Sequence, residues 1–257
     1  MAHDAVTSDR YSARRVFGPG NGLWAAGASL VFFVIAAFWT IWHIRDSGLE
    51  ARLLVTPTWE VALDPTLVSF ANEQAKPIFA AHCASCHGAD MKGNRAAGTP
   101  NLTDGNWLYG DGSVFEIERT ILFGIRSGNP KSRNVTDMTA FGQRGLLTEG
   151  EIGNVVQFVL AISRQSHQTE AATEGSKIFA GKGQCYDCHA PDARGNSYYG
   201  APDLTANVWS FGGDAPSLYK TVYFGRHGIC PSWLGPLDLK QVRALAVYIY
   251  SASHHET

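Results

Sequence analysis

Two Cys-x-x-Cys-His runs constrain this chain more than any other feature. They are Cys83-Ala84-Ser85-Cys86-His87 and Cys185-Tyr186-Asp187-Cys188-His189. In such a run each cysteine sulfur can add to a vinyl group of haem, and the adjacent histidine can reach the iron from the proximal side. A zinc site or a redox dithiol is the alternative for an isolated Cys pair, but two copies followed at once by histidine favour haem. We therefore predict two covalently bound haem c groups, with the four cysteines as attachment sites and the two histidines as iron ligands.

The chain repeats one module around these two runs. Pro100-Asn101-Leu102-Thr103 in the first copy corresponds to Pro202-Asp203-Leu204-Thr205 in the second. Repetition of this kind is typical of a duplicated structural unit. We therefore expect two haem-binding domains in tandem, over residues 70–165 and 170–252.

Helical patterns surround each haem motif. In the first module they predict a helix that leads into the Cys pair with Pro77 in its first turn, a middle helix over 114–123 and a last helix after Thr148. Thr148 and Glu151 have the spacing of a capping box. The last helix carries apolar residues at helical spacing that we expect to pack on the first helix of the same module: Ile152, Val155, Val156 and Val159.

One segment is apolar enough to cross a membrane. Residues 23–44 contain no Asp, Glu, Lys or Arg, and a helix of that length spans about 33 Å. A cleaved signal peptide fits less well, because the apolar run is long and no Ala-x-Ala-like site follows it. We predict an uncleaved transmembrane helix between a tail at residues 1–22 and a tether at residues 45–69.

Charge indicates how this anchor is oriented. Three arginines precede the segment and two follow it, which places the N-terminus in the cytoplasm. Since c-type haem is attached outside the cytoplasm in bacteria, we expect the haem domains in the periplasm, anchored to the inner membrane. The net charge of −2 argues against a nucleic-acid partner.

The distal iron ligands are less uniform than the proximal ones. Met138 stands in a loop before the last helix of the first module, where a thioether ligand for the iron of His87 is expected. The second module has Cys230 at the matching position, and three interpretations remain open for the iron of His189. In the first, Cys230 binds the iron as a thiolate. In the second, His227 binds the iron instead. In the third, the distal position is open and Cys230 is a small buried residue.

Other residues are candidates for supporting the proximal histidines or the haem propionates. The carbonyls of Pro100 and Pro202 are placed to accept the N–H of the proximal histidines. Four side chains are candidates for donating to haem propionates, with core packing as the alternative for the two tryptophans: Trp107, Trp209, Arg126 and Arg226.

The order of these features resembles one family closely. The resemblance rests on three segments that follow a single N-terminal span: Trp107-Leu108-Tyr109-Gly110, Arg133-Asn134-Val135-Thr136-Asp137-Met138 and Gly225-Arg226-His227-Gly228. The chain is similar to the di-haem membrane-anchored subunit III of cbb3-type cytochrome c oxidases. That resemblance implies a mainly α fold, with one transmembrane helix and two tandem class I cytochrome c domains. It also implies methionine at the position of Cys230, so this chain departs from the family there.

The resemblance implies a function as an electron relay. The partners implied are the catalytic and mono-haem subunits of the oxidase, with a soluble cytochrome c or a quinol–cytochrome c oxidoreductase as electron donor. Two alternatives stay open: a di-haem carrier for another periplasmic redox complex, and a di-haem enzyme similar to thiosulfate dehydrogenases that uses Cys230. A haem-based gas sensor is a further alternative, but no signalling domain follows the second module.

Overall fold

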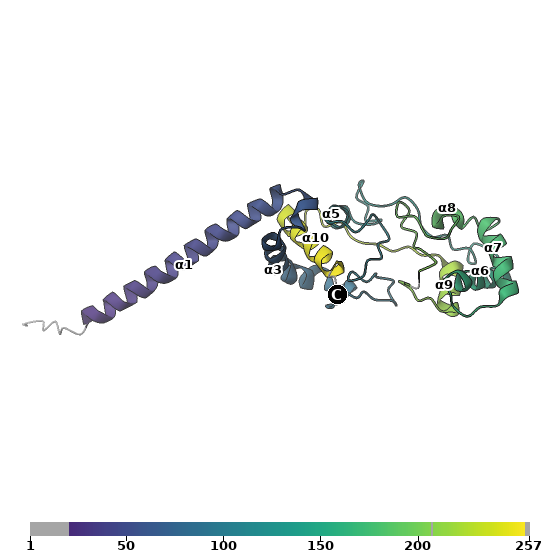
Figure 1. The fold of residues 1–257 in the computed structure, drawn as a ribbon, viewed down its shortest axis with the longest axis horizontal. Helices are drawn as coiled ribbons and strands as arrows, with labels where there is room; N and C mark the ends of the chain where they lie inside the picture. The colour runs from purple at the N-terminus through teal and green to yellow at the C-terminus, as the bar shows by residue number, and fades with distance from the viewer. Residues whose placement is uncertain (1–20, 207, 255–257) are drawn as a thin grey trace, which may run out of the picture. The chain divides into compact units, whose positions relative to one another are not determined.

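The computed structural model describes residues 21–206 and 208–254, and all the regular structure in those ranges is helical (Figure 1). Of the expected tail at residues 1–22, residues 1–20 lie outside the described residues. The helices are α1 (Asn21–Val55), α2 (Thr58–Val61), α3 (Pro65–His82), α4 (Ala84–His87), α5 (Val114–Phe123), α6 (Glu149–Ile162), α7 (Thr169–Ala180), α8 (Tyr186–His189), α9 (Ala215–Phe224) and α10 (Leu239–Ser253).

The N-terminal helix α1 is apolar and long enough for a single-pass membrane anchor over residues 30–55. It continues beyond residue 44, where the sequence predicts a tether. Residues up to Gly48 and residues from Leu49 onward form two separate compact units. The last turns of α1 are helical because Leu49 and Leu53 are buried in the core of the second unit. Arg243 also donates to the carbonyl of Leu53 at 3.1 Å, which satisfies a helix C-terminus.

Helix α3 begins earlier than the sequence suggests. Its N-cap is Asp64, whose carboxylate accepts from the backbone N–H of Thr66, and Pro65 occupies the first turn. Pro77 therefore lies inside the helix, and its prediction as a first-turn residue is wrong. The helix continues through this proline because an apolar face on both sides of it, including Phe70 and Phe79, is buried against other helices.

Two predicted helices of the first module, over 114–123 and after Thr148, are confirmed. Helix α5 runs from Val114 to Phe123, as expected. Helix α6 has a complete capping box between Thr148 and Glu151. Helix α10 has the same device between Asp238 and Gln241. These local signals fix where the helices begin, although they do not say which helices pack together.

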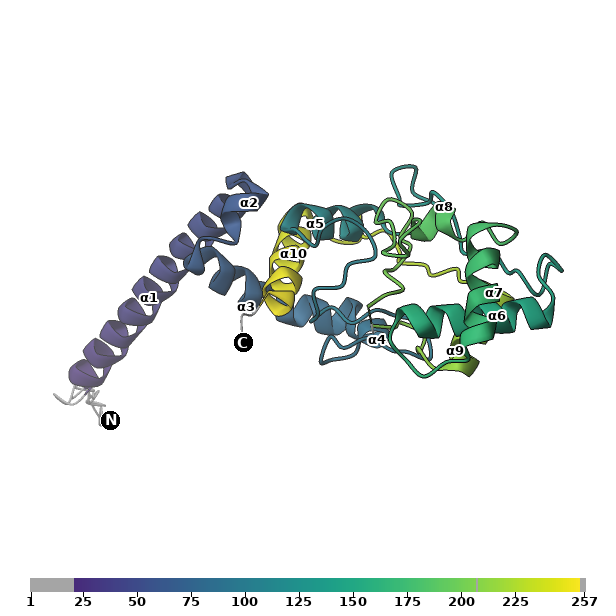
Figure 2. The same ribbon diagram turned by 45° about the vertical axis from the view of Figure 1, so that its right-hand side comes forward.

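Two hydrophobic cores form, and the modules exchange their last helices between them. The first core joins α3 and α5 of the first module with α10 from the end of the second. Figure 1 shows the C-terminal helix α10 beside α3 and α5, and Figure 2 shows the same grouping from a second direction. The buried residues that α10 contributes are Val242, Ala244, Leu245, Ala246, Val247 and Ile249.

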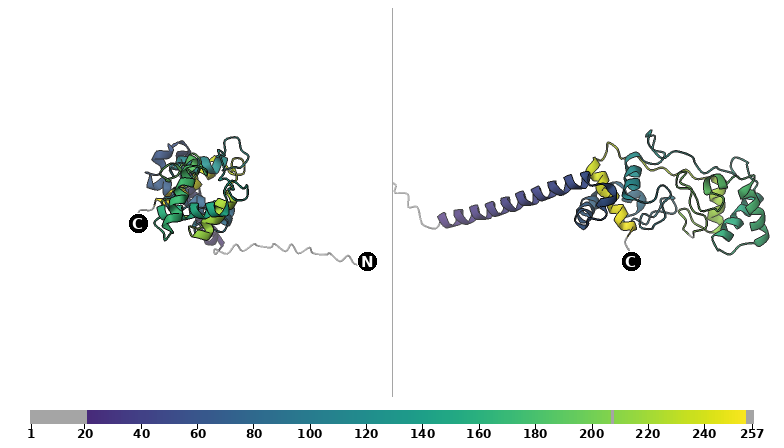
Figure 3. Two further views of the ribbon diagram at one scale, coloured as in Figure 1. Left: turned by 90° about the vertical axis from the view of Figure 1, so that its right-hand side faces the viewer. Right: turned by 45° about the horizontal axis from the view of Figure 1, so that its top comes forward.

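The second core contains the last helix of the first module. Helix α6 packs on α7 and α9, and the green helices of this group lie together in Figure 3 as well. Its apolar face includes Ile152, Val155, Val156 and Val159, and it buries Phe179 of α7. The prediction that these residues pack on the first helix of their own module is therefore wrong. Because the two modules are copies, α6 and α10 offer equivalent apolar faces, and each is used in the other copy.

The loops before the exchanged helices cross over in the same way. Ile125, just after α5, forms two backbone hydrogen bonds with Cys230, at 2.9 and 3.0 Å. Arg226, just after α9, forms two with Met138, both at 3.2 Å. Each loop thus runs along the end of the middle helix of the other module.

Glycine makes these crossings possible at two equivalent positions. Gly124 and Gly225 end α5 and α9 with φ of +72° and +70°, a left-handed conformation that favours glycine. A Cβ on Gly124 would overlap the carbonyl oxygen of Cys230, and one on Gly225 would overlap that of Met138. The close approach of the crossed loops therefore requires both glycines.

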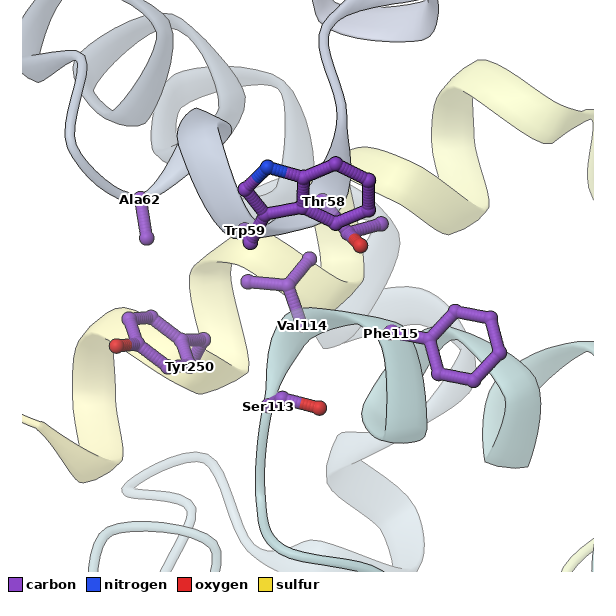
Figure 4. A pocket seen from close by; sticks show the side chains of 7 residues that line it. All are labelled: Thr58, Trp59, Ala62, Ser113, Val114, Phe115 and Tyr250. Atoms are coloured by element: carbon purple, nitrogen blue, oxygen red, sulfur yellow. The ribbon is translucent and has the colours of Figure 1, made fainter.

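A shallow apolar pocket lies in the second unit, where α2 meets α5 and α10 (Figure 4). Trp59, Val114, Phe115 and Tyr250 line much of it. It contains none of the candidate haem residues, so it is separate from the sites described next.

Candidate haem sites

Each Cys-x-x-Cys-His run forms a tight helical turn after the first helix of its module. Cys83 ends α3, and Cys86 and His87 lie in the short helix α4. The second run has the same arrangement in and before α8. Cysteines three residues apart lie on one face of a helical turn, which suits attachment to two vinyl groups of one haem. In the described residues, no cluster of three or more His, Cys, Asp or Glu side chains forms a zinc site.

Both proximal histidines contact the proline carbonyls expected from the sequence. Nδ1 of His87 lies 3.4 Å from the carbonyl oxygen of Pro100, and Nδ1 of His189 lies 3.1 Å from that of Pro202. Because a carbonyl oxygen only accepts, Nδ1 is the donor and Nε2 is left for the iron. Burial lowers the pKa of both imidazoles, with the proline contact acting in the opposite direction. Burial therefore favours the neutral form that binds metal.

Trp107 packs against the first core and leaves a buried donor without a partner. Its indole nitrogen Nε1 is buried and has no hydrogen-bond partner. A buried N–H without an acceptor costs roughly 1–3 kcal/mol, so the position calls for an absent acceptor such as a haem propionate. The indole lies against Gly112, where a Cβ would overlap the ring. Trp209, the equivalent residue, packs on the second core.

The two arginines proposed as propionate donors already form hydrogen bonds and ring contacts with other residues of the chain. Arg126 donates to the carbonyl of Gly228 at 2.6 Å and to the hydroxyl of Tyr109 at 3.0 Å. Arg226 donates to the hydroxyl of Thr221 at 2.6 Å and lies over the ring of Phe211, 3.9 Å from its centroid. The Arg126 guanidinium therefore ties two loops together, whereas that of Arg226 holds the end of α9 against the loop of Phe211.

The loop that carries Cys230 lies beside the first haem motif: the ring centroid of Trp233, three residues further on, is 5.1 Å from that of His82, which directly precedes Cys83. Burial first, and then the thiol of Cys86, raise the pKa of Cys230 to about 11. Burial first, and then Cys230 and Cys86, likewise raise the pKa of Cys83 to about 11. Of the three interpretations left open for the iron of His189, the one with Cys230 stays a prediction, and the structure places the loop of Cys230 at the end of α5 in the first module.

Met138 lies in the other half of the unit. It packs on the second core, together with Phe179, Cys185 and Trp209. The pairing of Met138 with His87 stays a prediction, and the structure places the loop that carries Met138 along the end of α9 in the other module. His227, the alternative ligand, has its Nδ1 2.7 Å from Oδ2 of Asp137.

The exchange is what sequence reasoning missed at this site. One signal was present. Only residues 163–168 separate α6 from α7, and a connection this short makes two helices antiparallel neighbours. That constraint alone would have paired the last helix of the first module with the first helix of the second.

The residues present fit covalently bound haem. Each motif supplies two thiols and one oriented imidazole, and the first has a buried donor that lacks an acceptor. Residues 71–159 match the family model described as cytochrome c oxidase, cbb3-type, subunit III. The chain is also 40% identical over 202 residues to a cbb3-type cytochrome c oxidase subunit FixP of Bradyrhizobium sp., covering 78% of this chain and 68% of the relative.

The chain belongs to the cbb3-type cytochrome c oxidase subunit III family. Two further relatives are named cbb3-type cytochrome c oxidase subunit CcoP. One, from Cereibacter sphaeroides, is 36% identical and covers 80% of this chain and 69% of the relative. The other, from Rhodobacter capsulatus, is 38% identical and covers 80% and 70%. Membership of this cbb3-type subunit III family supports haem c as the cofactor and a membrane-anchored place in an oxidase complex.

Proposed function

We propose that this chain is a di-haem electron-transfer subunit of a cbb3-type oxidase. It passes electrons from a soluble cytochrome c or a quinol–cytochrome c oxidoreductase towards the catalytic subunit, beside a mono-haem subunit. The observation that carries the proposal is the presence of two Cys-x-x-Cys-His sites within one compact unit, in a chain of this family. Two sites in one unit suit a relay between neighbouring carriers.

The proposal assigns two haem c groups to crossed sets of residues. Haem c supplies reversible one-electron oxidation and reduction when bound. Cys83, Cys86 and His87 hold the first group, with Cys230 from the second module as its distal ligand. Cys185, Cys188 and His189 hold the second, with Met138 from the first module. The placement of Cys230 near Cys86, and of Met138 on the core of Cys185, supports this pairing.

The surrounding residues orient these ligands and complete the sites. The carbonyls of Pro100 and Pro202 fix the proximal imidazole rings through Nδ1. The Trp107 indole donates to a propionate of the first haem. The Arg126 side chain and the Arg226 backbone hold the loops that carry the distal ligands. The guanidinium groups of both arginines are also the proposed donors to haem propionates.

The same proposal places the haem-binding unit in the periplasm. The N-terminal helix α1 supports a single-pass anchor, and the arginines on its N-terminal side support a cytoplasmic N-terminus in the bacterial inner membrane. Residues 1–22 are then a cytoplasmic tail, and residues from 45 onward face the donors.

Purification from native membranes tests the proposed function. The tagged full chain, extracted gently, is expected to carry two c-type haems and to bring down subunits with b-type haem, and the preparation should consume oxygen. A preparation with two c-type haems but without b-type haem or oxygen uptake would refute the oxidase assignment. It would instead indicate a carrier for another periplasmic complex.

A further inference from the structure

Two short loops carry the distal ligands, and a small group of charged residues joins them. We call residues 136–141, which contain Met138, the first distal loop. Residues 226–231, which contain Cys230, are the second distal loop. They belong to different modules, and under the proposed function they serve different irons.

Arg126 contacts a backbone carbonyl in each loop. Its Nε donates to Gly228 of the second distal loop at 2.6 Å, and its Nη1 donates to Thr136 of the first at 3.2 Å. The side chain is only 11% exposed. A buried guanidinium with two fixed acceptors restrains both loops, since its donors form a rigid planar fork.

Asp137 closes this arrangement with its two carboxylate oxygens. Oδ1 lies 3.3 Å from Nε of Arg126. Oδ2 lies 2.7 Å from Nδ1 of His227, in the second distal loop. The residue that precedes Met138 is therefore bonded to the loop that carries Cys230.

The contact is not repeated by the other copy of the module. By the sequence correspondence of Met138 with Cys230, the equivalent of Asp137 is Ile229, which is 64% exposed. Counted from the equivalent glycines that end α5 and α9, Gly124 and Gly225, the counterpart of His227 is Arg126, which belongs to the connection already described. The connection between the two distal loops therefore occurs once in a duplicated fold, so duplication of the module does not account for it.

We propose that Asp137, with Arg126 and His227, is a clasp that couples distal ligation at the two irons. These are positioning residues: they act through Met138 and Cys230 and do not touch the irons. The inference rests on the proposed function and adds to it, because it makes the openness of each haem depend on the loop of the other.

Carbon monoxide binding to the reduced, haem-loaded full chain in detergent measures this openness. A ferrous haem with a protein ligand on its distal side binds carbon monoxide only in the fraction of molecules where that ligand has left. Met138→Ala and Cys230→Ala variants assign the spectral change of each haem. The test variant is Asp137→Asn, and Glu174→Gln is the matched control, since Glu174 forms an exposed ion pair on α7.

The Asp137→Asn variant is expected to bind carbon monoxide about two- to tenfold more tightly at both haems, the range for losing a partly exposed, charge-assisted contact. Glu174→Gln should leave both affinities unchanged. A gain only at the haem of Met138, or at neither haem, would overturn the clasp. Through-space loss of charge shifts potentials but does not open a site, so it does not imitate the expected result.

A second variant decides the matter if Asp137→Asn fails to fold. His227→Gln, in the second distal loop, is expected to raise carbon monoxide affinity at the haem of Met138, in the other loop; no gain there contradicts the inference. A wild-type first haem that binds carbon monoxide as tightly as Cys230→Ala also contradicts it, because no distal ligand is then held. Failure of the proposed function is distinct, and it shows earlier, as fewer than two c-type haems or missing oxidase subunits.

Discussion

At the scale of single residues, the sulfur at position 230 sets this chain apart. The resemblance to subunit III implies methionine there, and the structure brings Cys230 to the first haem motif. A thioether favours ferrous iron and raises the reduction potential, whereas a thiolate adds negative charge and stabilises ferric iron. Binding as a thiolate also requires the thiol to lose its proton, and burial opposes this until the metal is present. The first haem is therefore expected to have the lower potential of the two.

Replacing Cys230 with methionine tests this assignment. The Cys230→Met variant is expected to raise the potential of one haem by on the order of 100 mV, because axial ligands set haem potentials over a wide range. A redox titration followed by visible spectra measures both haems, and the haem bound by Met138 serves as the internal control. A shift of the haem attached at Cys185 and Cys188 would contradict the crossed pairing.

At the scale of helices, the contact between α6 and α7 depends on one glycine. A Cβ on Gly175 of α7 would overlap the backbone carbonyl of Asn154 in α6 and approach Phe158. Its φ is not in the left-handed region, so space and not backbone conformation requires glycine. The helices approach this closely because the exchange places α6 on α7.

Alanine at this position is expected to destabilise the protein. Gly175→Ala should cost about 1–3 kcal/mol in the free energy of unfolding, as overpacking a core contact does. Gly153→Ala in α6 is the matched control, because nothing lies within 4 Å of its added Cβ, and it should stabilise by about 0.5–1 kcal/mol through helix propensity. Thermal unfolding followed by circular dichroism compares them. Equal stabilisation by both alanines would mean that α6 packs elsewhere.

Local sequence signals predicted the elements better than their partners. The capping pair Thr148 and Glu151 marks a helix start because a cap depends only on neighbours along the chain. Helical periodicity likewise identifies the apolar face of α6, but a face does not name the helix it packs on. In a duplicated chain the faces of α6 and α10 are equivalent, so both pairings satisfy the pattern.

The same limit explains the candidate site. The proximal contacts of His87 with Pro100 and of His189 with Pro202 lie within one module, and sequence reasoning placed them as the structure does. Met138 and Cys230 were chosen by their place before a last helix, which holds in both arrangements. Their pairing depends on long-range packing, which residue types and spacing do not encode.

At the scale of the whole molecule, the exchange makes the two modules one folding unit. The first core contains residues from both ends of the unit, from Leu49 to Ile249. Glu50 and Lys240 also form an ion pair across those ends, at 2.8 Å. Neither module alone contains the helices of a complete core, so neither should be stable by itself.

Fragments test this directly. Residues 49–165 and 166–257, produced separately in the periplasm, are each expected to lack cooperative unfolding and to retain little haem. Produced together, they should associate and regain both properties, since each supplies the helix that the other lacks. Circular dichroism and haem staining measure the outcome. Cooperative unfolding of the first fragment alone would show that α6 can close its own module.

Helix α10 also sets the order in which the chain can mature. The first haem motif is synthesised early, but α3 and α5 have no complete core until the final helix arrives from the other end of the chain. Closing so long a loop costs entropy and slows folding. The haem attached earliest in the sequence is thus enclosed last. A translation product that stops before Leu239 leaves the apolar face of α3 uncovered, and cellular proteases can recognise that surface as a sign of an unfinished subunit.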